Sequence, residues 1–302
     1  MIIKRIAHVF EAQGVKGLLS AVFRRLYTPR ARCFPACREI VSRANGIEIG
    51  GPSPLFAPGG LLPVYSLAER IDNCNFAPHT IFYNSNLMSR TDGNEVIEGD
   101  KSFVFKSGKS PGRQFIAEGG DLHMIPNESY AFVLSSHMLE HTSNPLRALE
   151  EWQRILQPGG GLILVLPHRD GTFDHRRPVT TLEHLILDFE RQVREDDLTH
   201  ISEVLQLHDL SLDFGITDAA AFRERIERNT EMRSLHHHVF DTRLAVAVVS
   251  KAGFELVTVE PLRPYHIIVV ARKSKQQPLT PRISEDTLDR LLRRSPFSTD
   301  RH

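Results

Sequence analysis

The segment from His168 to Pro178 gathers side chains that can transfer protons. It reads His-Arg-Asp-Gly-Thr-Phe-Asp-His-Arg-Arg-Pro and directly follows the most strand-like stretch of the chain, residues 160–168. A histidine can take a proton near neutral pH, and a carboxylate can orient its ring. We therefore predict that the catalytic residues are His175, His168 and Asp174.

The two arginines of this segment, Arg176 and Arg177, are predicted to bind the substrate. A guanidinium group is well suited to hold a phosphate or a carboxylate. A plainer interpretation stays open, in which the segment is a solvated loop with an Asp–Arg pair.

Glycines and acids follow other short apolar segments. Residues 46–50 form a candidate buried strand that contains Glu48 and ends in Gly50-Gly51. Glycines after the first strand of an α/β sheet let the backbone approach a ligand closely. Asp72 ends the next candidate strand, where an acid can bond a ribose hydroxyl.

The most specific pattern is LSSHMLEHTSNPLRALEEWQRILQPGGGLILVLP at residues 134–167. A strand ends in Ser-His, Leu-Glu-His and Asn-Pro follow, and an amphipathic helix stops at Pro-Gly-Gly before a new strand. This order resembles class I S-adenosylmethionine-dependent methyltransferases of the small-molecule type. The resemblance covers about residues 44–168 and 241–272.

The resemblance implies S-adenosylmethionine as the cofactor and assigns its ligands position by position. The acid and glycines of the first strand match those that hold the amino-acid end of the cofactor, and the acid of the second strand matches the ribose ligand. A pair after the third strand matches the adenine contact, and the end of the fourth strand lies near the methionyl part. In this sequence these residues are Glu48, Gly50, Gly51, Asp72, Asp121, Leu122, Ser136 and His137. Pro52 stands where the family prefers a small residue.

The elements that must position these residues alternate between strands and helices. Candidate strands lie at 46–50, 66–72, 114–121, 130–137 and 160–168, and the alternation resumes with a helix ending near Gly253 and strands up to residue 273. Continuous apolar strands alternating with helices indicate a Rossmann-like α/β fold, with a mostly parallel sheet and helices on both faces.

We expect three parts: a basic helical segment at 1–43, a methyltransferase domain at 44–272 and a polar tail at 273–302. Within the domain, residues 169–241 form a helical insertion or lid after the fifth strand, with helical patterns at 180–193, 197–208 and 218–230. In the tail we expect a short helix near 284–294 and a mobile remainder.

Composition narrows the choice of partners. Lys and Arg number 37 and Asp and Glu number 37, which argues against nucleic acid as a partner. Three cysteines suit a reducing compartment, and no apolar run is long enough to span a membrane, so we expect a cytoplasmic protein. Residues 1–45 carry nine Lys and Arg against Glu11 and Glu39, which indicates a basic face packed on the domain or peripheral contact with an anionic membrane.

Other interpretations of the motifs stay open. His137, Glu140 and His141 fit the H-x-x-E-H signature of zinc proteases, but His137 ends a predicted strand, so both imidazoles should not reach one metal. Consecutive side chains point apart, so we expect no metal at His236-His237-His238 either. The chain could also be a non-catalytic module of a complex.

The predicted reaction is methyl transfer to a polar acceptor. A polar insertion rich in His, Asp and Arg suits a saccharide hydroxyl, as on a surface glycan or its nucleotide-sugar precursor, with a small metabolite as the second choice. The oligomeric state does not follow from the sequence.

Overall fold

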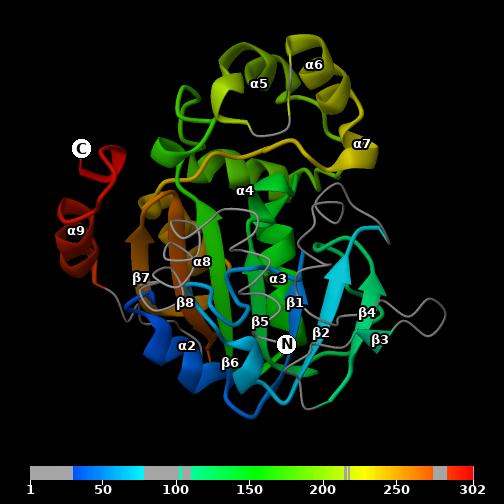
Figure 1. Ribbon diagram of the computed structural model, residues 1–302, viewed down its shortest axis with the longest axis vertical. Coiled ribbons are helices and arrows are strands. Elements are labelled where there is room, and N and C mark those ends of the chain that lie inside the picture. Colours follow the sequence, from blue (N-terminus) through cyan, green and yellow to red (C-terminus); the bar gives the residue numbers. More distant parts are fainter. Residues whose placement is uncertain are drawn as a thin grey trace, which may run out of the picture.

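The computed structural model describes residues 30–77, 102–103, 110–213, 216, 218–274 and 284–301. Within these residues lies an eight-stranded sheet with the order β3-β4-β2-β1-β5-β6-β8-β7 (Figure 1). The strands are β1 Asn45–Ile49, β2 Arg70–Asn75, β3 Ser102–Phe103, β4 Gly112–Ile116, β5 Tyr130–Ser136, β6 Leu156–Pro167, β7 Phe254–Leu262 and β8 His266–Lys273.

The direction of the strands confirms the predicted fold class. β1, β2, β4, β5 and β6 run parallel to one another. β8 is antiparallel to both β6 and β7, and the short β3 is antiparallel to β4. The chain builds outward from β1 to one side and then returns to β5 on the other side of β1. Such a switch point is where an open α/β sheet binds its ligands.

Helices cover both faces of the sheet, and β6 shows why. Its leucines at 162, 164 and 166 belong to one buried core, whereas Ile163 and Val165 belong to a second core on the opposite face. Helix α2 (Phe34–Val41) packs on the second face, while α3 (Pro145–Ile155) and α8 (Thr242–Lys251) pack on the first. Alternation along an apolar strand therefore produces a three-layer domain.

Helix α3 begins as its sequence predicts but ends differently. The Asn144 side chain accepts a hydrogen bond from Arg147 N and Pro145 occupies the first turn. The helix ends at Ile155, and strand β6 starts at Leu156, so Pro158-Gly159-Gly160 lies within the strand instead of stopping the helix.

Two predicted strands were displaced along the chain. The second was expected at 66–72, but residues 65–67 form a 3-10 turn and the strand is β2, because Asn45 of β1 pairs with Arg70. The third was expected at 114–121, but β4 ends at Ile116. Asp72 therefore lies inside its strand and not at its carboxyl end.

The insertion after β6 is helical, as predicted, and stands at the top of Figure 1. It contains α4 (Leu182–Glu190), α5 (Ile201–Leu207), α6 (Ala219–Glu227) and α7 (Asn229–Met232). Its outer part has a small core of its own, formed by Val204, Phe222, Ile226 and Leu235.

The C-terminal segment contains the predicted helix, α9 (Glu285–Arg293), but the residues after it are not mobile. Leu288 and Leu292 are buried in the main core. Asp300 is also buried and accepts hydrogen bonds from the backbone N and the Oγ1 of Thr242. The prediction of a mobile remainder is therefore wrong for residues 294–301.

Of the predicted basic segment, residues 1–29 lie outside the described part of the chain, which begins with a short stretch leading into α2. Among the helices of the described residues, none combines the length and the apolar character needed to cross a membrane.

Candidate active site

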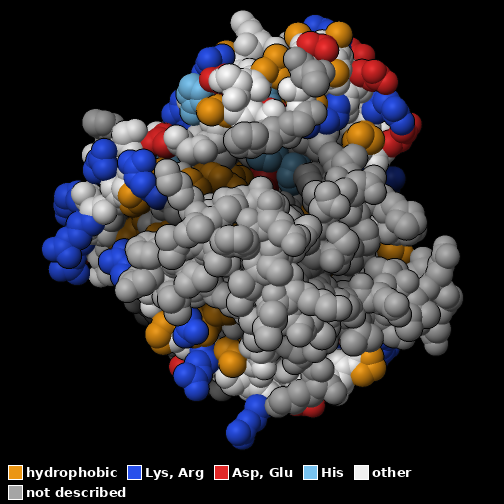
Figure 2. Space-filling model, in the orientation of Figure 1, with side chains coloured by type: hydrophobic (Ala, Val, Ile, Leu, Met, Phe, Trp, Pro, Cys, Tyr) orange, Lys and Arg blue, Asp and Glu red, His pale blue; other side chains and the backbone are white. Residues whose placement is uncertain are grey.

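A cavity lies at the switch point, where β1 and β5 end side by side. The sheet side contributes Ile49, Gly50, Asn75, Gly119 and Met138, and the insertion contributes Glu195 and Arg233. Figure 2 shows a hollow between the insertion and the sheet domain, with histidine side chains within it.

The loop after β1 holds two of the predicted cofactor residues against the cavity. Gly50 lines the cavity and has a φ of +81°, a left-handed conformation that favours glycine. A Cβ on Gly51 would lie 2.3 Å from the Glu48 carboxyl carbon. Both glycines are thus needed for this loop to pack.

Glu48 supports the loop from behind. It is fully buried, and its carboxylate accepts hydrogen bonds from Ser53 N at 2.9 Å and from Tyr65 Oη at 2.7 Å. Burial raises the pKa of Glu48 to about 8, against the opposing effect of these two donors. Both carboxylate oxygens are therefore engaged within the loop.

The structure places Asp72 away from the cavity. Its carboxylate is fully buried and accepts hydrogen bonds from Arg113 N at 2.9 Å and Tyr130 Oη at 2.7 Å. Asn75, at the carboxyl end of β2, lines the cavity instead, and its side chain donates to the Gly51 carbonyl. The shifted position of β2 explains this difference.

In the segment after β4, the predicted adenine-binding pair, Asp121 and Leu122, does not line the cavity. Asp121 is exposed and pairs with His123, which lowers the pKa of Asp121, and Leu122 is buried in the core. Glu118 and Gly119 line the cavity, and the Gly119 carbonyl accepts a hydrogen bond from Trp152 Nε1 at 2.9 Å.

The end of β5 carries Ser136 and His137. The Ser136 hydroxyl is buried and has no hydrogen-bond partner among the described residues. His137 has a φ of +51°, and its Nε2 lies 3.0 Å from His266 Nδ1. The sharp turn at His137 directs the next residue, Met138, into the cavity wall.

The insertion closes the cavity with charged residues that the sequence analysis did not identify. Arg233 donates to the Glu118 carboxylate and, at 2.7 Å, to the Glu195 carbonyl. Burial, with the nearby charge of Glu118, raises the pKa of Glu195 to about 7. No local pattern marks these two residues, because only the folded insertion brings them to the sheet.

The predicted catalytic residues do not form one group. His168 is fully buried, stacks on Phe297 and lies 3.1 Å from the Asp300 carboxylate. His175 is partly exposed, and its Nε2 lies 2.9 Å from Asp209 Oδ2. Asp174 is buried and pairs with neither of these histidines but with Arg177 and His236.

The two predicted substrate-binding arginines also differ from each other in exposure and in their partners. Arg176 is half exposed and pairs with Asp209 at 2.8 Å. Arg177 is 1% exposed and donates to Asp174, to Glu203 and to the carbonyls of His236 and His237. Arg177 is thus fully occupied inside the insertion, whereas about half of the Arg176 side chain is open to solvent.

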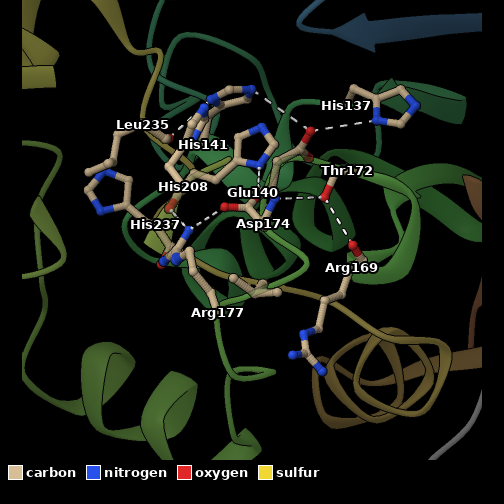
Figure 3. Close-up of polar contacts among 12 residues, drawn as sticks. His137, Glu140, His141, Arg169, Thr172, Asp174, Arg177, His208, Leu235 and His237 are labelled. Atoms are coloured by element: carbon tan, nitrogen blue, oxygen red, sulfur yellow. Dashed lines mark hydrogen bonds and ion pairs between the residues drawn. The ribbon is translucent and has the colours of Figure 1, made fainter. Parts of the chain in front are cut away.

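A cluster of imidazoles surrounds Glu140 beside the cavity (Figure 3). His137 Nδ1 lies 3.7 Å and His141 Nε2 lies 3.9 Å from Glu140 Oε1. Burial alone would raise the pKa of Glu140, but the imidazoles of His137, His141 and His236 lower it. Residues 139–141 form a single 3-10 turn after the strand, so the regular helix of an H-x-x-E-H protease is absent from this segment.

Comparison with known proteins gives a match over part of the chain. Residues 90–164 match the model of the methyltransferase domain. Among curated proteins, none matches the sequence of this chain.

Solved structures that resemble the chain include methyltransferases of low sequence identity. One from Methanosarcina mazei is 14% identical, with 80% of this chain and 98% of that chain covered and a TM-score of 0.43. One from Mesorhizobium loti has the same identity, coverage and TM-score. One from Aquifex aeolicus is 11% identical, with 79% and 87% covered and a TM-score of 0.42.

The methyltransferase-domain match at residues 90–164 and the mostly parallel sheet with its switch-point cavity agree with the resemblance to class I S-adenosylmethionine-dependent methyltransferases that the motifs indicate.

The cavity residues fit S-adenosylmethionine. A Cβ would lie 2.7 Å from Met138 if built on Gly50 and 2.8 Å from Met138 if built on Gly119. The lack of a side chain at both positions therefore leaves space in the cavity. Glu118 brings a carboxylate to a cofactor that carries a sulfonium and an ammonium cation. When bound, the cofactor supplies an electrophilic methyl group.

Proposed function

We propose that this methyltransferase acts on a hydroxyl group of a polar acceptor, with a saccharide as the first choice and a small polar metabolite as the second. The observation that carries the proposal is the set of polar side chains that line the cavity. Glu195 and Arg233 of the insertion and His141 after β5 are among them, and all three are polar or charged. Such a wall suits an acceptor that makes hydrogen bonds over a flat apolar one.

A hydroxyl acceptor must lose its proton as the methyl group arrives. Its oxygen forms the new bond to the methyl carbon, the carbon–sulfur bond breaks with its electrons on sulfur, and a base takes the proton. The protein's main contribution is to hold the acceptor oxygen in line with that bond.

We assign the base to His137, with His175 as the alternative from the sequence. His137 follows β5, immediately precedes the cavity residue Met138 and has a partly exposed side chain beside the Glu140 carboxylate. His175 is oriented by Asp209 and is also exposed, whereas burial separates His168 and Asp174 from an acceptor. The half-exposed Arg176 is the candidate for binding an acceptor anion.

The experiment that tests the acceptor class uses methyl-labelled S-adenosylmethionine with nucleotide sugars, oligosaccharides, amines and carboxylic acids. We expect label on the sugars as an ether that resists alkali. Label only on amines, or only as an alkali-labile ester, would contradict the proposal.

Variants separate the two assigned roles. Arg176→Ala should raise the KM for an anionic acceptor about tenfold, the loss of one charge-assisted contact, with unchanged cofactor affinity. His137→Gln should lower kcat about 10²-fold or more, and His175→Gln should leave it nearly unchanged. The reverse order for the two histidines would move the base to His175.

We also propose that the protein acts in the cytoplasm. Its three cysteines are buried and free, which supports a reducing compartment. Peripheral contact of the basic residues 1–45 with a membrane-linked acceptor is part of the same proposal.

A further inference from the structure

Glu140 is a buried carboxylate whose hydrogen-bonding capacity is not used. Its exposed fraction is 0%, and neither oxygen has a hydrogen-bond partner among the described residues. The distances of 3.7 and 3.9 Å to His137 and His141 are too long for hydrogen bonds. An ionised carboxylate in this position is costly unless a cation or donor compensates it.

Two imidazoles beside Glu140 have their tautomers fixed by hydrogen bonds at the ring nitrogen that faces away from Glu140. His141 Nδ1 donates to the Leu235 carbonyl at 3.1 Å, since a carbonyl can only accept. This bond makes Nε2, the nitrogen on the Glu140 side, the one with the lone pair.

His236 is held in a similar way by a carboxylate. Its Nδ1 donates to Asp174 Oδ2 at 2.5 Å. The other Asp174 oxygen accepts from Arg177, as Figure 3 shows. A carboxylate behind a histidine is the usual second shell of a metal-binding imidazole. His141 and His236 meet edge to face, with ring centroids 4.5 Å apart.

We propose that Glu140, His141 and His236 bind one divalent transition-metal ion, with Zn²⁺ as the first candidate. One ligand atom from each residue lies within 4.8 Å of the other two. Bonds of about 2.1 Å in a tetrahedral zinc site place ligand atoms about 3.4 Å apart, so the side chains need to close by up to about 1.4 Å. Two histidines and one carboxylate leave a coordination position open.

The open position is adjacent to the methyl-transfer site, because His141 also lines the cofactor cavity. This part of the inference rests on the proposed function. A hydroxyl that approaches the ion there would become more acidic, which would ease its deprotonation by His137. Metal binding itself does not depend on which acceptor is used.

Two other groups of similar composition include residues of the insertion, and in each of them ring nitrogens are already engaged by a neighbouring group. His184 Nε2 lies 3.3 Å from His200 Nε2 and 3.2 Å from Asp188, and His238 Nε2 donates to the Ser143 carbonyl.

In the group of Asp197, His200 and His237, Asn229 donates to His237 Nε2, which places the His237 proton on Nδ1, the nitrogen on the Asp197 side. These arrangements favour the Glu140 group as the metal site.

The test measures metal binding by the full chain after removal of bound metal with a chelator. Titration with Zn²⁺, followed by calorimetry, should give one site per chain. Co²⁺, used as a spectroscopic substitute, should give the visible absorption of a four-coordinate site with nitrogen and oxygen ligands. Glu140→Gln and His236→Gln should each weaken Zn²⁺ binding at least about 100-fold, more than the loss of an outer partner does.

The matched control is His184→Gln, which changes a histidine of the neighbouring group and should leave the affinity for Zn²⁺ unchanged. Far-UV circular dichroism of each variant shows that it is folded. For the wild-type protein, Zn²⁺ should raise the Tm and excess chelator should lower it again.

Three results would overturn the proposal. One is no saturable binding of Zn²⁺ or Co²⁺ by the wild-type protein at concentrations up to about 1 mM, a range that detects even weak sites. Another is undiminished binding by Glu140→Gln. The third is loss of binding in His184→Gln alone, which would move the site to the neighbouring group. Since none of these readouts uses an acceptor, they are independent of the proposed methyl acceptor.

Discussion

Glu195 lines the cavity, and its charge changes near neutral pH. Its side chain comes from the insertion, close to Glu118 and with Ser143 N as a weak donor at 3.3 Å. Burial raises its pKa from 4.5 to about 7, so the folded protein favours the protonated carboxyl. The unfolded chain releases this proton at much lower pH.

This difference predicts how stability changes with pH. The contribution of Glu195 is fully present below pH 4.5 and is lost as the pH rises through about 7. Glu195→Gln removes this loss. Between pH 5 and pH 8, the free energy of unfolding of the variant should therefore rise relative to that of the wild-type protein by up to about 3 kcal/mol. Urea unfolding across this range measures the difference.

The control for this prediction is Glu150→Gln on the exposed face of α3, which should not change the pH dependence. If the Glu195→Gln and wild-type curves ran parallel from pH 5 to pH 8, Glu195 would have an ordinary pKa.

At the scale of the element, Arg177 joins three segments of the insertion. It connects the loop after β6 to α5 through Glu203, and to the strand-like residues His236 and His237 through their carbonyls. Since the guanidinium is buried and bonded on all sides, it fixes the segment that carries His236.

We predict that Arg177→Met destabilises the protein by about 3–5 kcal/mol, because the buried Asp174 charge then loses its arginine partner and keeps only His236. Arg176→Ala removes an exposed charge next to it and should cost no more than about 1 kcal/mol. Thermal unfolding of both variants makes the comparison. Equal losses for the two arginines would show that burial of Arg177 is not what holds the insertion.

The same elements show what a sequence can and cannot predict here. Apolar runs predicted β1, β5 and β6, and the spacing of Leu146, Leu149 and Trp152 predicted α3, because local patterns decide these elements. The predicted position of β2 was wrong, because pairing with β1, and not the apolar run, decides where β2 begins.

Site residues follow the same division. Gly50 lies in a recognisable loop and lines the cavity. Glu195 and Arg233 come from the insertion, and their partners are distant in sequence, so no local motif indicated them. Arg177 was predicted to bind substrate from its type alone, and its burial depends on contacts with residues 203 and 236.

At the scale of the whole molecule, the C-terminal segment holds the end of β6 and the start of α8 together. Asp300 accepts from Thr242, at the first position of α8, and from Ser295, and it lies 3.1 Å from His168, which directly follows β6. The tail thus fastens the base of the insertion to the sheet domain.

Asp300→Ala should therefore lower the free energy of unfolding by about 3 kcal/mol, since it leaves buried donors of Thr242 and Ser295 without their acceptor. Asp286→Ala, on the exposed first turn of α9, is the control and should cost less than about 1 kcal/mol. Chemical denaturation measures both. A loss for Asp300→Ala no larger than that of the control would show that the tail does not contribute to stability.

The most direct test of the central claim is calorimetric titration with S-adenosylmethionine and S-adenosylhomocysteine. The wild-type protein should bind each at one site. Gly50→Val should abolish binding, because its side chain would collide with Met138 at the cavity. Gly59→Ala, at a glycine with a similar φ of +93° but open space around it, should bind as the wild type does. Absence of binding by the wild-type protein, or equal binding by Gly50→Val, would contradict a cofactor site between β1 and β5.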